Sequence, residues 1–429
     1  MTDPDASLAT GQRSLGDPEV TFPLFPPLVA GCPTTSTDAV QYPLEVDYDY
    51  DRAEPGLFDQ PPLPGLRRWQ PLLPPLDPGM DLGAGGTPLV AAGGVADAVG
   101  YDGELLVKDE SANPTWSHKD RLAYAAVSAA KESGAPGVVV ASSGNHGAAT
   151  AAHAARADLP CVVVTSTDVA GSMDRFLRAY GAAVVGVPRD RRWDCVRALH
   201  DRLGYQPVSN LTRTHTGHPF GPEGYKTVGY ELFRQLDGRA PGTVFVPTGY
   251  AELLYGVWKG FRELSALGVA DATPRMVACE PAARAPLSAA LAADEAARTV
   301  AAAPTDAASI GVTVGGYRGV RAVRESGGTA YALADGAIRT AQDRLAADGH
   351  WQELSAAAGV AGLAAAVDAG DPVPGPAVAV CTSSGFKDPR DGASIPEVDP
   401  DRVLDALAEE YGLGPPDEER TDGNAESAR

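Results

Sequence analysis

Short apolar segments alternate with segments of helical periodicity through most of the chain after Gly83. Apolar runs predict strands at residues 105–107, 137–141, 161–164 and 184–187. Between them, apolar residues recur at helical spacing and predict helices at residues 120–133, 148–157 and 173–180. This alternation is typical of a parallel sheet flanked by helices.

The same alternation returns in the second half. It predicts strands at residues 243–246, 275–279 and 377–381, and helices at 252–266 and 335–347. The first ~80 residues are rich in Pro, Asp and Gly and predict an extended arm or a small wrapped subdomain. A helix is predicted at 402–411, and the acidic tail that follows has the low hydrophobicity of a disordered segment. We therefore predict an α/β fold with two lobes.

The composition of the chain argues against a nucleic-acid-binding or membrane protein. The 429 residues are 44% hydrophobic, enough for a large core, and the net charge of −21 repels DNA, RNA and anionic lipid. No run approaches the ~18 apolar residues of a membrane helix. The five cysteines form no CxxC pair and follow no signal-peptide pattern. We expect a cytoplasmic protein without nucleic-acid or membrane partners.

The first segment that could carry a reactive side chain is Ser117-His118-Lys119-Asp120-Arg121, where a loop meets a helix. A helix start disfavours a cation, so the pKa of an amine there is lowered and the amine can condense with an aldehyde. Lys119 is thus a candidate Schiff-base lysine, although this segment alone fits a solvated surface lysine equally well. Of the six lysines, Lys131, Lys226 and Lys259 are expected to be helix residues near solvent, and Lys108 and Lys387 charge partners near the site.

Three further loops each follow a predicted strand. Ser142-Ser143-Gly144-Asn145-His146-Gly147 opens a helix and presents backbone amides suited to an anion such as a carboxylate or a phosphate. The alternative is a tight turn that needs Gly and Asn only for their backbone conformations.

The segment 247–256 is a second candidate anion loop, and 381–388 places polar residues at the carboxyl end of the last strand, where open α/β sheets bind ligands. Ordinary loops remain the alternative for both.

The chain resembles the threonine synthase family of pyridoxal-phosphate enzymes, within the tryptophan synthase β-like group of fold type II, from about Gly83 to Pro389. The matching segments, in matching order and spacing, are Gly86-Thr87-Pro88-Leu89, Lys108-Asp109-Glu110, Asn113-Pro114-Thr115, Lys119-Asp120-Arg121, Ser142-Ser143-Gly144-Asn145 and Glu223-Gly224-Tyr225-Lys226-Thr227. Segment 42–49 looks like the one that follows the family's N-terminal cysteine pairs, but Cys32 alone remains and cannot form a zinc ribbon.

The resemblance implies two open twisted sheets flanked by helices. It implies an N-terminal arm at 1–82, a large cofactor-binding lobe at 83–125 and 215–399, a small lobe at 126–214, and a helix with an acidic tail at 400–429. It implies that Lys119 binds pyridoxal phosphate covalently and shuttles the Cα proton, and that Asn145 hydrogen-bonds the cofactor's phenolic oxygen. Thr382 would face the ring nitrogen, and the cofactor phosphate would bind Thr248, Gly249, Tyr250, Ala251 and Glu252. The substrate would be bound by Ser117, His118, Ser142, Ser143, Gly144 and His146.

Several positions depart from the family pattern. Trp116, His118 and His146 replace the usual residues, and Gly221 stands where the family carries an arginine for the substrate phosphate. Replacement charge could come from Arg213, Lys226 or a histidine among His118, His146, His215 and His218, although each has a plain structural interpretation too. His215 and His218 at i, i+3 lack a third ligand, so no metal is predicted.

The leading prediction is a threonine synthase that acts on O-phosphohomoserine by γ-elimination and addition of water at Cβ, working as a homodimer. Gly221 and His146 favour the alternative, a β-eliminating or β-replacing relative such as a serine/threonine dehydratase or an O-phosphoserine-dependent synthase. A third and more remote hypothesis is a subunit that binds the cofactor but is catalytically inactive.

Overall fold

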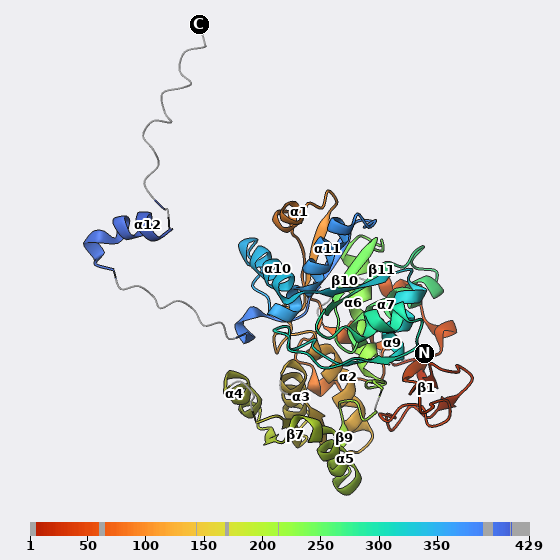
Figure 1. Ribbon diagram of the computed structural model, residues 1–429. Helices are drawn as coiled ribbons and strands as arrows, with labels where there is room; N and C mark the ends of the chain where they lie inside the picture. The colour runs from red at the N-terminus through yellow and green to blue at the C-terminus, as the bar shows by residue number, and fades with distance from the viewer. Residues whose placement is uncertain are drawn as a thin grey trace. The chain divides into compact units, whose positions relative to one another are not determined.

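The computed structural model describes residues 6–59, 65–142, 144–167, 171–212, 214–388, 398–411 and 413 (Figure 1). Contacts divide the chain into two units, Met1–Asp388 and Pro389–Arg429. In the second unit the predicted helix is present as α12 (Val403–Tyr411), after a 3-10 turn at Pro400–Arg402. The predicted disorder of the rest of the tail lies outside the described residues.

Two sheets carry the α/β part of the first unit. The larger has the order β14-β11-β10-β15-β5-β4, parallel except for β4 at the edge. The smaller has the order β8-β7-β6-β9 and is parallel throughout. The strands of the larger sheet are β4 (Leu89–Ala91), β5 (Leu105–Asp109), β10 (Thr243–Pro247), β11 (Arg275–Pro281), β14 (Thr329–Leu333) and β15 (Ala377–Cys381). The strands of the smaller sheet are β6 (Val138–Ala141), β7 (Cys161–Thr165), β8 (Ala183–Gly186) and β9 (Gln206–Pro207). The prediction of two parallel sheets is confirmed.

Helices cover both faces of the larger sheet (Figure 1). Alternate strand residues explain this: Val244, Val246 and Val378 pack in one core with α2, α6, α7 and α9, whereas Phe245 and Ala379 pack in another with α1, α10 and α11. The helices of the first unit are α1 (Gly93–Val99), α2 (Lys119–Glu132), α3 (Asn145–Arg156), α4 (Gly171–Ala179), α5 (Arg192–Leu203), α6 (Gly221–Gln235), α7 (Glu252–Ala266), α8 (Pro286–Ala292), α9 (Tyr317–Glu325), α10 (Asp335–Ala347) and α11 (Ala358–Ala369).

The N-terminal segment forms a small antiparallel sheet of order β2-β1-β3, with β1 (Ala9–Ser14), β2 (Thr21–Phe22) and β3 (Leu44–Tyr48). A two-stranded ribbon of β12 (Arg298–Thr299) and β13 (Val314–Gly315) completes the strands. Trp69, in the 3-10 segment Leu66–Leu72, is buried in the same core as α6. The predicted ranges of the arm and of the two lobes stay predictions.

Glycines allow the backbones of α2, α6 and α7 to come into direct contact with one another. A Cβ at Gly224 would lie 2.1 Å from the Arg121 carbonyl oxygen, and one at Gly260 would lie 2.3 Å from the Lys226 carbonyl oxygen. A side chain at either position would force the helices apart. This close packing holds Tyr225 on α6 beside the start of α2, where Lys119 lies.

Two buried ion networks occupy the polar faces of these helices. The Arg121 network joins Arg121 to Glu110 and Glu231, with Lys108 2.7 Å from Glu231. A second network joins the arm to α6 and α7 and consists of Glu45, Glu223, Lys226, Lys259 and Glu263. The expectation that Lys226 and Lys259 lie near solvent is wrong, because both side chains are fully buried among carboxylates.

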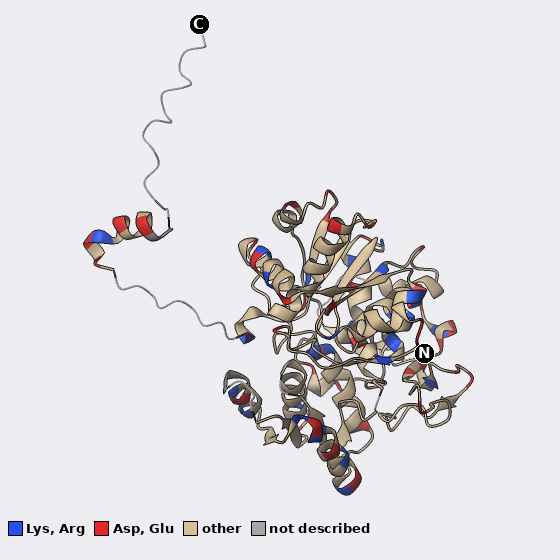
Figure 2. Ribbon diagram, viewed as in Figure 1, with Lys and Arg blue, Asp and Glu red and all other residues tan. Residues whose placement is uncertain are grey.

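Figure 2 shows charged residues on outer helices such as α4 and α5. Among the described residues, none of the helices combines the length and the apolar character that a membrane crossing requires.

Glu231→Gln should destabilise the protein by about 3–5 kcal/mol, because it leaves Lys108 buried without its carboxylate partner. Chemical denaturation followed by circular dichroism measures this loss. The matched control is Asp194→Asn, which removes the partner of Arg191 in a pair whose side chains are 65% and 63% exposed. The control should unfold like the wild type. Equal stability of the two variants would contradict the role given to the network.

Candidate functional site

Lys119 is the first residue of α2, one residue earlier than predicted, and its side chain points to α6. Its Nζ donates a hydrogen bond of 3.2 Å to the Tyr225 hydroxyl. Burial lowers the pKa of Lys119, and the carboxylates of Glu252 and Glu353 oppose that shift. Lowering the pKa raises the fraction of free amine, which is the form that attacks an aldehyde.

Asn145 begins α3, in the loop that follows β6. Its amide nitrogen donates to Glu353 Oε2 at 2.8 Å, and its Oδ1 accepts a hydrogen bond of 2.7 Å from Lys387 Nζ. The loop therefore contacts Glu353 and Lys387, which are more than 200 residues away in the sequence. In the same loop the Gly144 amide donates to Ser142 Oγ, whereas the predicted substrate residue Ser143 lies outside the described residues.

The candidate phosphate loop runs from Thr248 to Glu252, between β10 and α7. Ala251 caps α7 in the left-handed region at φ +61°, a conformation uncommon for a residue with a Cβ. Within the described residues, the amides of Gly249, Tyr250 and Ala251 donate no backbone or side-chain hydrogen bond. Together with the free amides of the first turn of α7, they are donors suited to a phosphate.

Glu252 turns away from this loop, as expected if it begins α7. Its Oε1 accepts a hydrogen bond of 3.1 Å from the His218 amide and lies 3.8 Å from Arg318. Gly217 makes room for the carboxylate, because a Cβ there would lie 2.1 Å from Glu252 Oε1. The positive charge of Arg318 therefore offsets the carboxylate next to the phosphate loop.

Thr382 follows β15 and adjoins the start of α2. Its carbonyl oxygen accepts the His118 amide at 3.0 Å and faces His118 Nδ1 at 3.1 Å. Ser117 pairs with Ser383 in an isolated β-bridge, and Ser117 Oγ is buried with no hydrogen-bond partner. The Thr382 side chain is 6% exposed. Lys119 and Thr382 thus belong to one small region.

The predicted replacements for the missing arginine separate into two groups. His118, His146 and His215 lie close enough to Lys119 for its charge to lower their pKa values, and His218 lies beside His146. Lys226 belongs instead to the buried network of the arm, so it is wrong as a candidate. Arg213 lies outside the described residues.

Gly221 is the first residue of α6 and is tightly enclosed. A Cβ there would lie 2.9 Å from Leu122 Cδ1 and 3.4 Å from Glu252 Oε1. A side chain at this position would require the end of the Leu122 side chain to shift, whereas its distance from Glu252 is an ordinary van der Waals contact.

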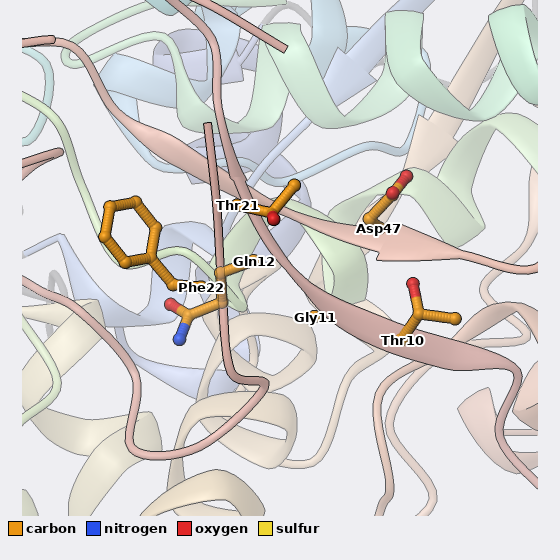
Figure 3. Close-up of a pocket in the computed structure, with 6 residues that line it drawn as sticks. All are labelled: Thr10, Gly11, Gln12, Thr21, Phe22 and Asp47. Atoms are coloured by element: carbon orange, nitrogen blue, oxygen red, sulfur yellow. The ribbon is translucent and has the colours of Figure 1, made fainter. Parts of the chain in front are cut away.

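A surface hollow is lined by six residues of the N-terminal sheet, namely Thr10, Gly11, Gln12, Thr21, Phe22 and Asp47 (Figure 3). Its one carboxylate, Asp47, is paired with Arg13 at 3.1 Å. None of the candidate site residues lines it. Among the described residues, no three His, Cys, Asp or Glu side chains are grouped as metal ligands would be.

Comparison with known proteins shows the family to which the chain belongs. Residues 80–385 match the family described as "Pyridoxal-phosphate dependent enzyme". The chain therefore belongs to the pyridoxal-phosphate-dependent enzymes, in their threonine synthase-like group. It is 33% identical over 359 residues to the threonine synthase of Methanosarcina acetivorans, covering 81% of this chain and 86% of the relative. The threonine synthase of Synechocystis sp. is 36% identical over 333 residues, covering 76% and 83%.

Solved structures agree on the fold. The T.th. threonine deaminase superposes with a TM-score of 0.59 at 26% identity, covering 72% of this chain and 94% of that one. The processed threonine deaminase isoform 2 of Solanum lycopersicum gives 0.60 at 24% identity, covering 76% and 84%. The predicted tryptophan synthase β-like fold is confirmed.

The residues present fit pyridoxal phosphate, because they include an amine of lowered pKa for its aldehyde, a loop of amides without hydrogen-bond partners for its phosphate, and a hydroxyl residue next to the start of α2 for its ring nitrogen. The role of each residue stays a prediction.

The sequence alone does not identify Tyr225, Glu353 or Arg318 as residues of this region. Tyr225 stands in one of the segments that match the family and could be singled out there. Glu353 and Arg318 lie in stretches without a polar pattern, and only the folded chain brings them to the site.

Lys387 is expected to lose its proton near pH 8. Burial lowers its pKa to about 8, while Glu353 and Asp120 oppose the shift. Acetic anhydride reacts with the free amine, so labelling of Lys387 should rise with a midpoint near that pH. Glu353→Gln removes a charge that raises this pKa, so its midpoint should be lower.

Brief labelling between about pH 6 and pH 10, followed by peptide mass spectrometry, measures both midpoints. Lys387→Gln serves to assign the labelled peptide. An unchanged or raised midpoint in Glu353→Gln would contradict the electrostatic effect of Glu353 on Lys387.

Proposed function

We propose that the protein is a threonine synthase that converts O-phosphohomoserine to threonine by γ-elimination of phosphate and addition of water at Cβ. The observation that carries the proposal is Lys119, an amine of lowered pKa at the start of α2, next to His118, whose amide donates to the Thr382 carbonyl. The threonine synthases at 33% and 36% identity support this substrate. A cytoplasmic location and a homodimeric assembly are part of the same proposal.

Pyridoxal phosphate, when bound, stabilises the negative charge that develops at Cα of an amino acid. Lys119 supplies the amine that holds the cofactor and then carries the proton from Cα. The Tyr225 hydroxyl accepts a hydrogen bond from Lys119 Nζ and so fixes the direction of that amine. The threonyl hydroxyl of Thr382, unlike a carboxylate, would leave the pyridine nitrogen of the bound cofactor largely unprotonated, which would favour prompt elimination.

The loop amides from Gly249 to Leu253 bind the cofactor phosphate, and the loop at Ser142, Ser143 and Gly144 binds the substrate carboxylate. Asn145 would hydrogen-bond the cofactor's phenolic oxygen. Because both polar groups of Asn145 are engaged by Glu353 and Lys387, binding would exchange one of these partners. His118, which follows Ser117, and His146, which follows Asn145, would contact the substrate.

One observation favours a second function. Gly221 stands where the family carries an arginine for the substrate phosphate, and His146 occupies a position that resembles dehydratase relatives. The second candidate is therefore a hydroxy-amino-acid dehydratase, which would need no phosphate-binding arginine. The fold itself accommodates either chemistry.

The purified protein, loaded with pyridoxal phosphate, should be incubated in parallel with O-phosphohomoserine, O-phosphoserine, threonine and serine. We expect equal amounts of inorganic phosphate and threonine from O-phosphohomoserine and little 2-oxo acid from threonine or serine. Chromatography of amino acids and a phosphate assay measure these products. Lys119→Ala is the matched control and should release neither. A 2-oxo acid from threonine, without threonine formation, would identify the dehydratase instead.

A further inference from the structure

Glu252 places a carboxylate next to the amides that are suited to a phosphate. It is the first residue of α7, and the first hydrogen bond of that helix runs from the Tyr255 amide to the Ala251 carbonyl. Within the described residues, the amides of Glu252, Leu253 and Leu254 therefore have no partner. A carboxylate in the first turn of a helix can accept hydrogen bonds from such amides, and it would then compete with a phosphate for the same donors.

The side chain of Glu252 is held away from that helix end. Its Oε1 accepts a hydrogen bond of 3.1 Å from the His218 amide and lies 3.8 Å from Arg318 Nη1. Gly217 provides the space, because a Cβ there would lie 2.1 Å from Glu252 Oε1 and 2.7 Å from Arg318 Nη1. The amides of α7 thus stay free although a carboxylate stands at the first position of the helix.

Arg318 is the cation that faces this carboxylate. Among the described residues, no other lysine or arginine forms an ion pair with Glu252. His215 Nε2 lies 3.9 Å from Glu252 Oε2, but burial and the charge of Arg318 lower the pKa of His215 well below its ordinary value. The imidazole is therefore neutral at pH 7. Burial lowers the pKa of Lys119 and Glu252 opposes that shift, but the proposed function assigns this amine to the cofactor's aldehyde. The neutralisation of Glu252 therefore depends on Arg318.

Arg318 is itself fixed by segments that are distant in the sequence. Its side chain is buried, and its guanidinium donates to the carbonyl of Leu44 on β3 and to the carbonyl of Thr216 before α6. The guanidinium carbon also lies 5.6 Å from the centre of the Tyr255 ring on α7. These contacts leave the guanidinium little freedom to follow Glu252 elsewhere. The N-terminal arm thus helps to fix the positive charge beside the candidate phosphate loop.

Helix α9, which carries this arginine, also packs directly on the loop. A Cβ at Gly319 would lie 2.7 Å from Ala251 Cβ, so a glycine allows α9 to approach the residue that caps α7. Within the loop, Tyr250 stacks on His215 with ring centroids 3.8 Å apart and an interplanar angle of 8°. The loop therefore contacts the same two elements that hold the Glu252 side chain, namely α9 and the segment before α6.

We propose that Arg318 is a positioning residue for the cofactor's phosphate: it neutralises Glu252 and keeps that carboxylate off the start of α7, so that the loop can bind a phosphate dianion. The inference rests on the part of the proposed function that assigns the phosphate to residues 248–252, and it is independent of the amino-acid substrate. Without Arg318, the carboxylate would repel the phosphate and could itself accept hydrogen bonds from the α7 amides.

The affinity of the apoprotein for pyridoxal phosphate, relative to its affinity for pyridoxal, isolates the contribution of the phosphate. Pyridoxal has the same ring and aldehyde, so a general disturbance of the site changes both affinities equally. Quenching of tryptophan fluorescence measures the two Kd values. Arg318→Met should lower the ratio of the affinities roughly 10- to 100-fold, because the phosphate then meets an unpaired carboxylate.

Substitution of Glu252 separates the charge of Arg318 from its structural contacts. Glu252→Gln keeps an oxygen for the His218 amide and removes the negative charge. In the double variant Arg318→Met/Glu252→Gln, the ratio should return to within about threefold of the wild type, because no carboxylate is left to neutralise. Arg318→Lys keeps the positive charge and should retain most of the ratio. The matched control is Arg324→Met on the same helix, at an exposed pair with Asp294, and it should leave the ratio unchanged.

Two results would overturn the proposal. An unchanged ratio in Arg318→Met, or a lowered ratio that Glu252→Gln does not restore, would show that the arginine acts only through its contacts with Leu44 and Thr216. If Arg318→Met does not fold, Glu252→Gln alone decides the question. The charge of Arg318 is then unopposed, so the ratio should rise roughly threefold or more, and an unchanged ratio overturns the proposal.

These outcomes are separable from the product assay, because no amino-acid substrate is present in the binding measurement. A ratio that depends on Arg318 as expected, without threonine formation, would reject the proposed function and keep this inference. Threonine formation together with a ratio that is insensitive to Arg318 would reject this inference alone. Equal affinity of the wild type for both compounds would reject the assignment of the phosphate to the loop, and the inference with it.

Discussion

Arg121 fixes the geometry on which the site depends. It lies two residues after Lys119, is fully buried, and binds Glu110 at the end of β5 and Glu231 on α6 through charged hydrogen bonds of 2.6–2.8 Å. A buried guanidinium tolerates little displacement, because each lost contact leaves a charge unpaired. The start of α2 is therefore anchored both to the large sheet and to the helix that carries Tyr225.

The candidate site contains basic groups inside an acidic protein. The chain carries a net charge of −21, yet Lys119 stands at the start of α2, Lys387 donates to Asn145, and Arg318 lies 3.8 Å from Glu252, which follows the loop of free amides. The neighbouring carboxylates Glu252 and Glu353 are each engaged by specific partners. Local charge rather than net charge decides what binds here, since a low-dielectric site strengthens nearby interactions.

Much of the fold could be predicted from the sequence, because its buried strands are short runs of Val and Ala with clear ends. The strand at 377–381 and the helices at 252–266 and 335–347 have the predicted bounds. Helix α3 begins at Asn145, three residues before the predicted start, because the loop residues themselves form its first turn. Helix α6 could not be delimited, because its Glu223, Lys226 and Glu231 look solvated although networks bury them.

The candidate site likewise contains some residues that the sequence could indicate and others that only the folded chain brings together. Lys119 and the loops that carry Asn145 and Thr382 could be proposed from local motifs, since the carboxyl ends of strands and the starts of helices are places where ligands bind. The individual roles of Asn145 and Thr382 are implied only by the resemblance to the family. The places of Arg318 and Glu353 depend on contacts between segments distant in sequence. No local pattern encodes such contacts.

The covalent attachment of the cofactor tests the central claim most directly. The protein saturated with pyridoxal phosphate should be reduced with borohydride, digested and mapped by mass spectrometry. We expect the pyridoxyl group on Lys119, and no attachment in a folded Lys119→Ala variant. Attachment to Lys387 or to any other lysine of the wild type would contradict the assignment of Lys119.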